Sequence, residues 1–86
     1  MYIEFTSSRL HDASTSIGDA NRLFGTIIGT EEFHQLFGHK ALKLHPLRGD
    51  RDGKYAIALT GNYRLILEKI DEETVRVVEV EDNHGH

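Results

Sequence analysis

The feature that most constrains the fold is the dipeptide Gly61-Asn62, which lies between two runs of β-forming residues. The runs cover residues 55–60 and 63–68. A two-residue Gly-Asn connection between such runs is typical of a β-hairpin in which glycine adopts positive φ. With a two-residue turn, the expected cross-strand pairs are Thr60 with Tyr63, Ala58 with Leu65 and Ala56 with Leu67. This register places alanines and leucines on the face that helices cover, and Arg64 on the other face.

The rest of the chain predicts one strand, then helices, then further strands. Alternation at residues 2–6 indicates a short strand, and apolar spacing indicates helices near 8–17, 19–28 and 31–37. Ser7 or Ser8, Asp19 and Thr30 can cap these helices, because short oxygen-bearing side chains accept the free amide protons of a first turn. Gly29 can end the second helix in the left-handed conformation. Strands follow from residue 42, with a turn at 71–73 and a last strand at 75–80.

Length and composition limit the protein class. With 86 residues, the chain has room for a single domain, residues 1–86, with a modest core. No apolar run approaches the length of a membrane span, and the first residues lack the pattern of a signal peptide. There is no cysteine, which excludes disulfides and thiolate chemistry and is compatible with a reducing cytoplasm.

Positive charge is concentrated in one segment of an acidic chain. The net charge is −4, yet residues 39–64 hold six basic residues and only two acidic ones. A local basic patch on an acidic body suits a site that grips phosphate at one place. The alternative is a solvated loop with ordinary surface charges.

The end of the chain carries a candidate acid–base pair. If the last strand continues with period two, Val78, Val80, Asp82 and His84 point the same way. A carboxylate can orient an imidazole and raise its pKa, and histidine titrates near neutral pH. The alternative is a frayed polar terminus.

Basic side chains in and after the loop are suited to phosphate: Arg48, Arg51, Lys54 and Arg64. RNA cleavage without a metal requires deprotonation of the 2′-hydroxyl, stabilisation of the phosphorane charge and protonation of the leaving 5′-oxygen. Arginines can supply the second, and an Asp/His pair can supply the proton transfers. Six histidines are present, but without cysteine or a His-Glu-x-x-His pattern we expect no metal site. No nucleotide-binding glycine motif is present, so we expect no cofactor.

Three ordered segments resemble the HigB-like toxins of the RelE/ParE superfamily. Residues 44–57 (LHPLRGDRDGKYAI) resemble the family's LHPLKGDR-x-G-x-aromatic-x-I segment, residues 62–66 (NYRLI) its YRL(I/F)F strand, and residues 75–85 (VRVVEVEDNHG) its terminal VRIIEVVDYHG. The match covers about half of the chain. Asn83 stands where the family commonly has tyrosine, which removes a possible base-stacking or proton-handling group.

The resemblance implies an α+β fold, with N-terminal helices packed on a twisted antiparallel sheet. It also implies a type II toxin–antitoxin module, in which the toxin is a cytoplasmic, metal-independent endoribonuclease that cleaves mRNA on the ribosome. The implied partner is a small antitoxin, often a helix-turn-helix DNA-binding protein. Residue by residue, it assigns catalysis to Asp82, His84, Arg64 and Arg48. We expect His45, Arg51 and Lys54 to contact RNA.

Two other functions stay open at this point. One is a ParE-like module that inhibits its target without cleaving RNA, and the other is an inactive relative that only binds a partner. The Asp82-x-His84 ending favours the nuclease, whereas Asn83 keeps the inactive alternative open.

Overall fold

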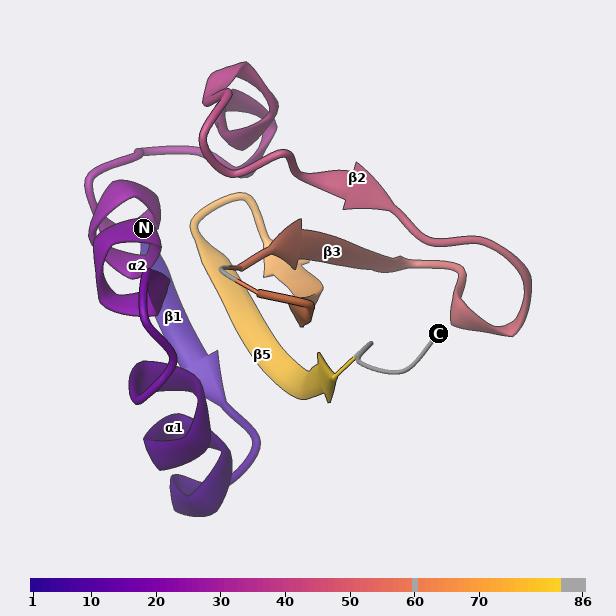
Figure 1. The fold of residues 1–86 in the computed structure, drawn as a ribbon. Helices are drawn as coiled ribbons and strands as arrows, with labels where there is room; N and C mark the ends of the chain where they lie inside the picture. Colours follow the sequence, from indigo (N-terminus) through magenta and orange to yellow (C-terminus); the bar gives the residue numbers. More distant parts are fainter. Residues whose placement is uncertain (60, 83–86) are drawn as a thin grey trace.

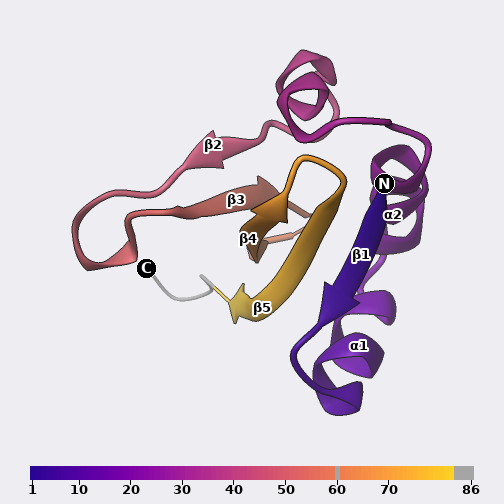
Figure 2. The ribbon, with the colours of Figure 1, turned by 180° about the vertical axis from the view of Figure 1, so that it is seen from behind.

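A five-stranded sheet forms the centre of the fold, with the helices on one face (Figures 1 and 2). The structure is a computed structural model, and it describes residues 1–59 and 61–82. The strands are β1 (Tyr2–Phe5), β2 (His45–Pro46), β3 (Lys54–Ala58), β4 (Tyr63–Asp71) and β5 (Thr74–Asp82). The helices are α1 (Ser8–Thr15) and α2 (Ala20–Ile28), with short 3₁₀ helices η1 (Phe33–Gly38) and η2 (Gly49–Arg51).

The expected α+β class is confirmed, and one strand pairing differs from the antiparallel expectation. The strand order is β1-β5-β4-β3-β2. The four later strands alternate in direction, whereas β1 and β5 are parallel, with Tyr2 opposite Thr74 and Phe5 opposite Val77. The helices carry the chain from β1 across to the opposite edge of the sheet. The antiparallel strands then bring β5 back beside β1, which makes the sheet mixed.

Local signals located the first two helices well, but not all of their caps. The Ser7 side chain accepts a hydrogen bond from the amide of Leu10 at 3.1 Å, which confirms it as the cap of α1. Asp19 precedes α2 as expected, but its carboxylate pairs with Arg22 at 3.1 Å instead of capping. Gly29 ends α2 with φ −76°, so the expected left-handed conformation is wrong. Its amide continues the helical turn by donating to the Gly25 carbonyl.

The third helix is a tight 3₁₀ helix, and the expectation that Thr30 caps it is wrong. Glu32 is the cap, through a reciprocal pair of hydrogen bonds with Gln35. The Thr30 hydroxyl instead donates to the Thr26 carbonyl at 2.8 Å, at the end of α2. Thr30 lies three residues before Phe33, where η1 begins, so it does not occupy the cap position, and its hydroxyl also lies 3.0 Å from Nε2 of His39.

The predicted register of the β3–β4 hairpin is also wrong, by one residue. Ala58 lies opposite Arg64, and Ile57 lies opposite Leu65. A one-residue slip exchanges the two faces of a strand. In the observed register, Leu59, Ile57 and Tyr55 share the helix-covered face with the leucines of β4, whereas the predicted register would place alanines there. Burial of the larger side chains favours the observed pairing.

The core lies between this face of the sheet and the helices. Its completely buried members come from α2, η1, the segment that precedes β2 and the three central strands: Ala20, Ile27, Leu36, Leu42, Ile57, Leu65, Leu67, Val75 and Val77. Among the described residues, no helix combines the length and the apolar character needed to cross a membrane.

Candidate functional site

The candidate site lies on the face of the sheet opposite the helices. Leu65 and Leu67 of β4 belong to the core, so their neighbours Arg64, Ile66 and Glu68 point to the other face. Ile66 is completely buried on that face, opposite Ala56 of β3 and Glu79 of β5. The face therefore has an apolar centre with charged side chains on both sides of it.

Arg64 is held by a glutamate on the neighbouring strand. Its Nε and Nη2 atoms donate to Oε1 of Glu81 at 3.1 and 2.6 Å. The two residues are direct cross-strand partners in the β4–β5 pair, so the sheet fixes their approach. The Glu81 side chain is 17% exposed and that of Arg64 is 30% exposed, which partly shields the pair from water.

Arg51 reaches the same glutamate from the loop between β2 and β3. In both views, this loop extends away from α1 and α2 (Figures 1 and 2). The Nη1 atom of Arg51 lies 2.7 Å from Oε2 of Glu81, and its Nη2 atom lies 3.5 Å from Oε1 of Glu79. Nη2 is buried and has no hydrogen-bond acceptor among the described residues. Each oxygen of Glu81 thus contacts a different arginine.

These contacts stabilise the charged form of Glu81. The hydrogen bond from Arg64 lowers the pKa of this carboxyl most, the hydrogen bond from Arg51 lowers it further, and partial burial opposes both. At neutral pH the cluster of Arg51, Arg64, Glu79 and Glu81 has two positive and two negative charges. Its arginines are ordered, but their charge is balanced within the protein.

Lys54 lies in a second row of charges on the same face. Its Nζ atom is 3.6 Å from Glu68, Arg76 is 3.6 Å from the other oxygen of Glu68, and Arg76 also binds Glu4 at 3.0 Å. The row crosses β3, β4, β5 and β1 with alternating sign. Lys54 thus shares the face of Arg64, and its contact with RNA stays a prediction.

His45 is exposed on β2, opposite Ala56. Its Nδ1 atom lies 2.9 Å from the Lys43 carbonyl. A carbonyl oxygen can only accept, so Nδ1 carries the proton and Nε2 is the acceptor when the ring is neutral. The backbone therefore sets the tautomer of this histidine.

The remaining predicted site residues are not all gathered with Arg64. Arg48 is exposed at the start of η2, three residues before Arg51. Asp82 is exposed at the end of β5 and pairs with Tyr63, so strand alternation assigns it to the face opposite Glu81 and Arg64. His84 lies outside the described residues. The expected alternation from Val78 is interrupted by a bulge, although Val80 and Asp82 do share a face.

Sequence reasoning missed Glu81, the residue that joins the two arginines. A signal was present: a hairpin centred on Glu72 and Glu73 places Arg64 opposite Glu81. Two register shifts occur within this hairpin and cancel, so the simple prediction would have been right.

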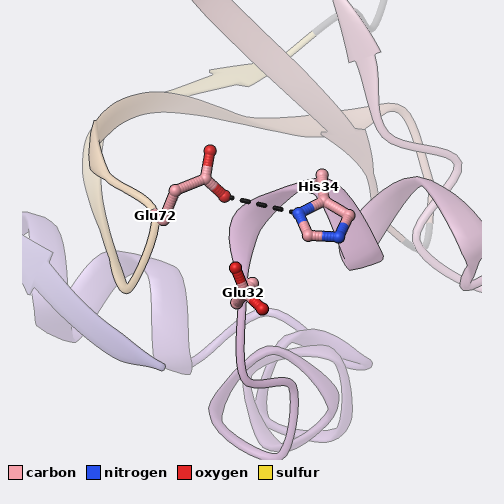
Figure 3. Close-up of side chains that lie close together, drawn as sticks. All are labelled: Glu32, His34 and Glu72. Carbon is pink, nitrogen blue, oxygen red and sulfur yellow. Dashed lines mark hydrogen bonds and ion pairs between the residues drawn. The ribbon is translucent and has the colours of Figure 1, made fainter.

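A second cluster has the donor types of a metal site (Figure 3). Ligand atoms of Glu32, His34 and Glu72 lie within 4.8 Å of one another, and all three residues are exposed. Glu72, however, binds the Lys69 ammonium at 2.7 Å and His34 at 3.5 Å, while Glu32 caps η1. Two of the three groups already have partners that a metal would have to displace, so we assign no metal to this cluster.

The chain is similar to known proteins in both sequence and fold. It is 32% identical to endoribonuclease HigB from Proteus vulgaris over 73 residues, which are 85% of this chain and 60% of HigB. The chain thus spans less than two thirds of the length of this relative. No protein-family model matches it.

Two solved structures have the same fold. A histidine-to-glutamine mutant of YafQ from E. coli superposes with a TM-score of 0.58 at 20% identity, over 94% of this chain and 91% of that chain. YafQ from E. coli strain BL21(DE3) superposes with a TM-score of 0.57 at 19% identity over the same shares of each chain. The resemblance to HigB-like proteins is confirmed: the chain is HigB-like in sequence and has the fold of YafQ.

Proposed function

We propose that this HigB-like chain is the toxin of a type II toxin–antitoxin system, a metal-independent endoribonuclease that cleaves mRNA on the ribosome in the cytoplasm. One observation carries the proposal: two ordered arginines, Arg51 and Arg64, meet on the open face of the sheet in a chain similar to endoribonuclease HigB. The partner that would restrain it is an antitoxin, a small helix-turn-helix protein.

The arginine cluster supports phosphate binding. Guanidinium groups remain charged at all relevant pH values and can bind two oxygens of a phosphate. The contacts of Glu81 show how the two arginines hold an anion, because each of its two oxygens contacts a different arginine. The Nη2 atom of Arg51 is buried without a hydrogen bond among the described residues, and an unsatisfied buried donor costs about 1–3 kcal/mol.

The proposed reaction is a transesterification within the RNA. The 2′-oxygen loses its proton and attacks phosphorus, the bond from phosphorus to the 5′-oxygen breaks, and that oxygen gains a proton. We assign His84 as the proton shuttle, with Asp82 orienting its ring. Arg48 and Arg64 would stabilise the phosphorane charge, and His45, Arg51 and Lys54 would hold the flanking RNA.

The test is induction of the chain in cells, followed by mapping of mRNA 5′ ends. The nuclease predicts new ends at a fixed position relative to codons, which disappear in His84→Ala and become rarer in Arg64→Ala. Growth arrest without new ends would instead indicate a non-nucleolytic inhibitor, and absence of any arrest would indicate an inactive relative. Purified chain mixed with mRNA, with and without ribosomes, decides whether cleavage needs the ribosome.

A further inference from the structure

An apolar groove runs along the edge strand β1, away from the arginine cluster. Its volume is about 910 Å³. Apolar side chains from β1 and α2 line it: Tyr2, Ile3, Phe5, Phe24 and Ile28. Because Tyr2 and Ile3 point to opposite faces of the strand, the groove follows the edge of the sheet. Among the described strands, β1 has one neighbour, β5.

Two apolar side chains in this groove are unusually exposed. Tyr2 is 71% exposed and Ile28 is 59% exposed. Burial of such side chains by a partner stabilises a complex by roughly 25 cal/mol for each Å² removed from water. At about 3.3 Å per residue, β1 makes the groove long enough for about four residues of an extended chain or two turns of a helix.

One end of the groove is strongly acidic. Glu31, Glu32, Glu72 and Glu73 all line it. Two backbone hydrogen bonds hold this end together, from Phe33 to the Glu72 carbonyl and from Tyr2 to the Glu73 carbonyl, both at 2.7 Å. Glu72 is partly neutralised by Lys69 and contacts His34 (Figure 3), whereas no ion pair of the described residues involves Glu31 or Glu73. The ammonium of Met1, which donates to the Ile28 and Thr30 carbonyls, also lies at the groove, so the glutamates outnumber the cationic groups and the groove combines an apolar wall with net negative charge.

We propose that this acid-rimmed groove, lined by Phe5, Phe24 and Ile28, binds a segment of the antitoxin that carries bulky apolar side chains next to lysine or arginine. The inference rests on the proposed function for the identity of the partner. Charge complementarity selects a basic segment, since an acidic one would meet four glutamates. The groove borders β1, whereas Arg51 projects from the loop at the other edge of the sheet.

The experiment measures binding of the purified chain to the purified product of the open reading frame adjacent to its own, by calorimetry at several salt concentrations. We expect Ile28→Glu, and separately Glu31→Lys with Glu73→Lys, to weaken binding by about tenfold or more. These side chains are exposed, so thermal unfolding and RNA cleavage should stay as in the wild type. The matched control is Asp50→Lys with Asp52→Lys, the same charge change in the loop at the opposite edge, which should leave binding unchanged.

The possible results of this experiment distinguish failure of the docking proposal from failure of the nuclease proposal. If both groove variants bind like the wild type, or if the wild type forms no complex with this product, the docking proposal is wrong even where RNA is cleaved. If the groove variants lose the partner while the wild type cleaves no RNA, the docking surface stands and the nuclease proposal fails. For the wild type, binding should weaken with salt, and this dependence should be smaller in the Glu31/Glu73 variant.

Discussion

Arg64 and Glu81 are direct cross-strand partners, and the guanidinium donates twice to one oxygen of the carboxylate, at 3.1 and 2.6 Å. The arginine that we assign to the RNA phosphate therefore already binds an anion from its own chain. In the proposed function, RNA would have to share or replace this contact. Glu81 thus holds Arg64 in place and also competes with phosphate for it.

Replacement of Arg64 tests the positive half of this pair. We expect Arg64→Ala to lower the cleavage rate by about tenfold or more, because a phosphorane loses a charged donor. Arg64→Lys should restore only part of the rate, since an ammonium cannot offer two fixed, parallel donors. The measurement is single-turnover cleavage, with far-UV circular dichroism to confirm folding. An unchanged rate in Arg64→Ala would remove this residue from the mechanism.

Replacement of Glu81 should strengthen the binding of RNA. Glu81→Gln keeps an acceptor for the arginines but removes the competing charge, so RNA should bind more tightly, by a factor of about 3–10. The dependence of affinity on salt should become steeper, because more cationic charge is available to phosphate. Fluorescence anisotropy with labelled RNA measures both. Glu68→Gln, in the separate row of charges, is the control. Weaker binding in Glu81→Gln would show that this glutamate serves mainly to position the arginines.

The pH dependence of stability should also reveal Glu81. In the folded chain its pKa is held below the ordinary value of a glutamate, chiefly by the hydrogen bond from Arg64. A carboxyl with a lowered folded pKa contributes stability above its unfolded pKa and loses it as pH falls through the folded value. The free energy of unfolding of the wild type should therefore exceed that of Glu81→Gln at neutral pH, and the difference should shrink below about pH 4.5. Urea denaturation across this range measures it; a difference independent of pH would contradict the ion pair.

The hairpin register makes a prediction about stability. Ile57 is completely buried opposite Leu65, so Ile57→Ala should cost about 2–5 kcal/mol. Ala58 is exposed opposite Arg64, so Ala58→Gln should change the free energy of unfolding by less than about 0.5 kcal/mol. The register expected from a two-residue turn would instead place Ala58 toward the helices and make its replacement costly. Chemical denaturation of the two variants distinguishes the registers.

Short-range signals in the sequence determined where most elements begin and end. Ser7 caps α1 because its oxygen and the Leu10 amide are neighbours along the chain, and glycine at position 61 adopts φ +75° where the chain reverses. The HigB-like segments likewise identified Arg48, Arg64, Asp82 and His84 as candidates without knowledge of the fold. These inferences need only residues that are close in sequence or a linear motif.

Only the tertiary structure decided which side chains meet. The one-residue shift of β3 depends on which face of the hairpin the helices bury, and the parallel pairing of β1 with β5 joins segments about 70 residues apart. The pairing of β4 with β5 brings Arg64 to one oxygen of Glu81, and Arg51 reaches the other oxygen from the loop between β2 and β3. Sequence alone could propose that the arginines bind phosphate. The sheet determined that they first bind a carboxylate of the chain itself, because cross-strand contacts and burial act between residues that no local pattern connects.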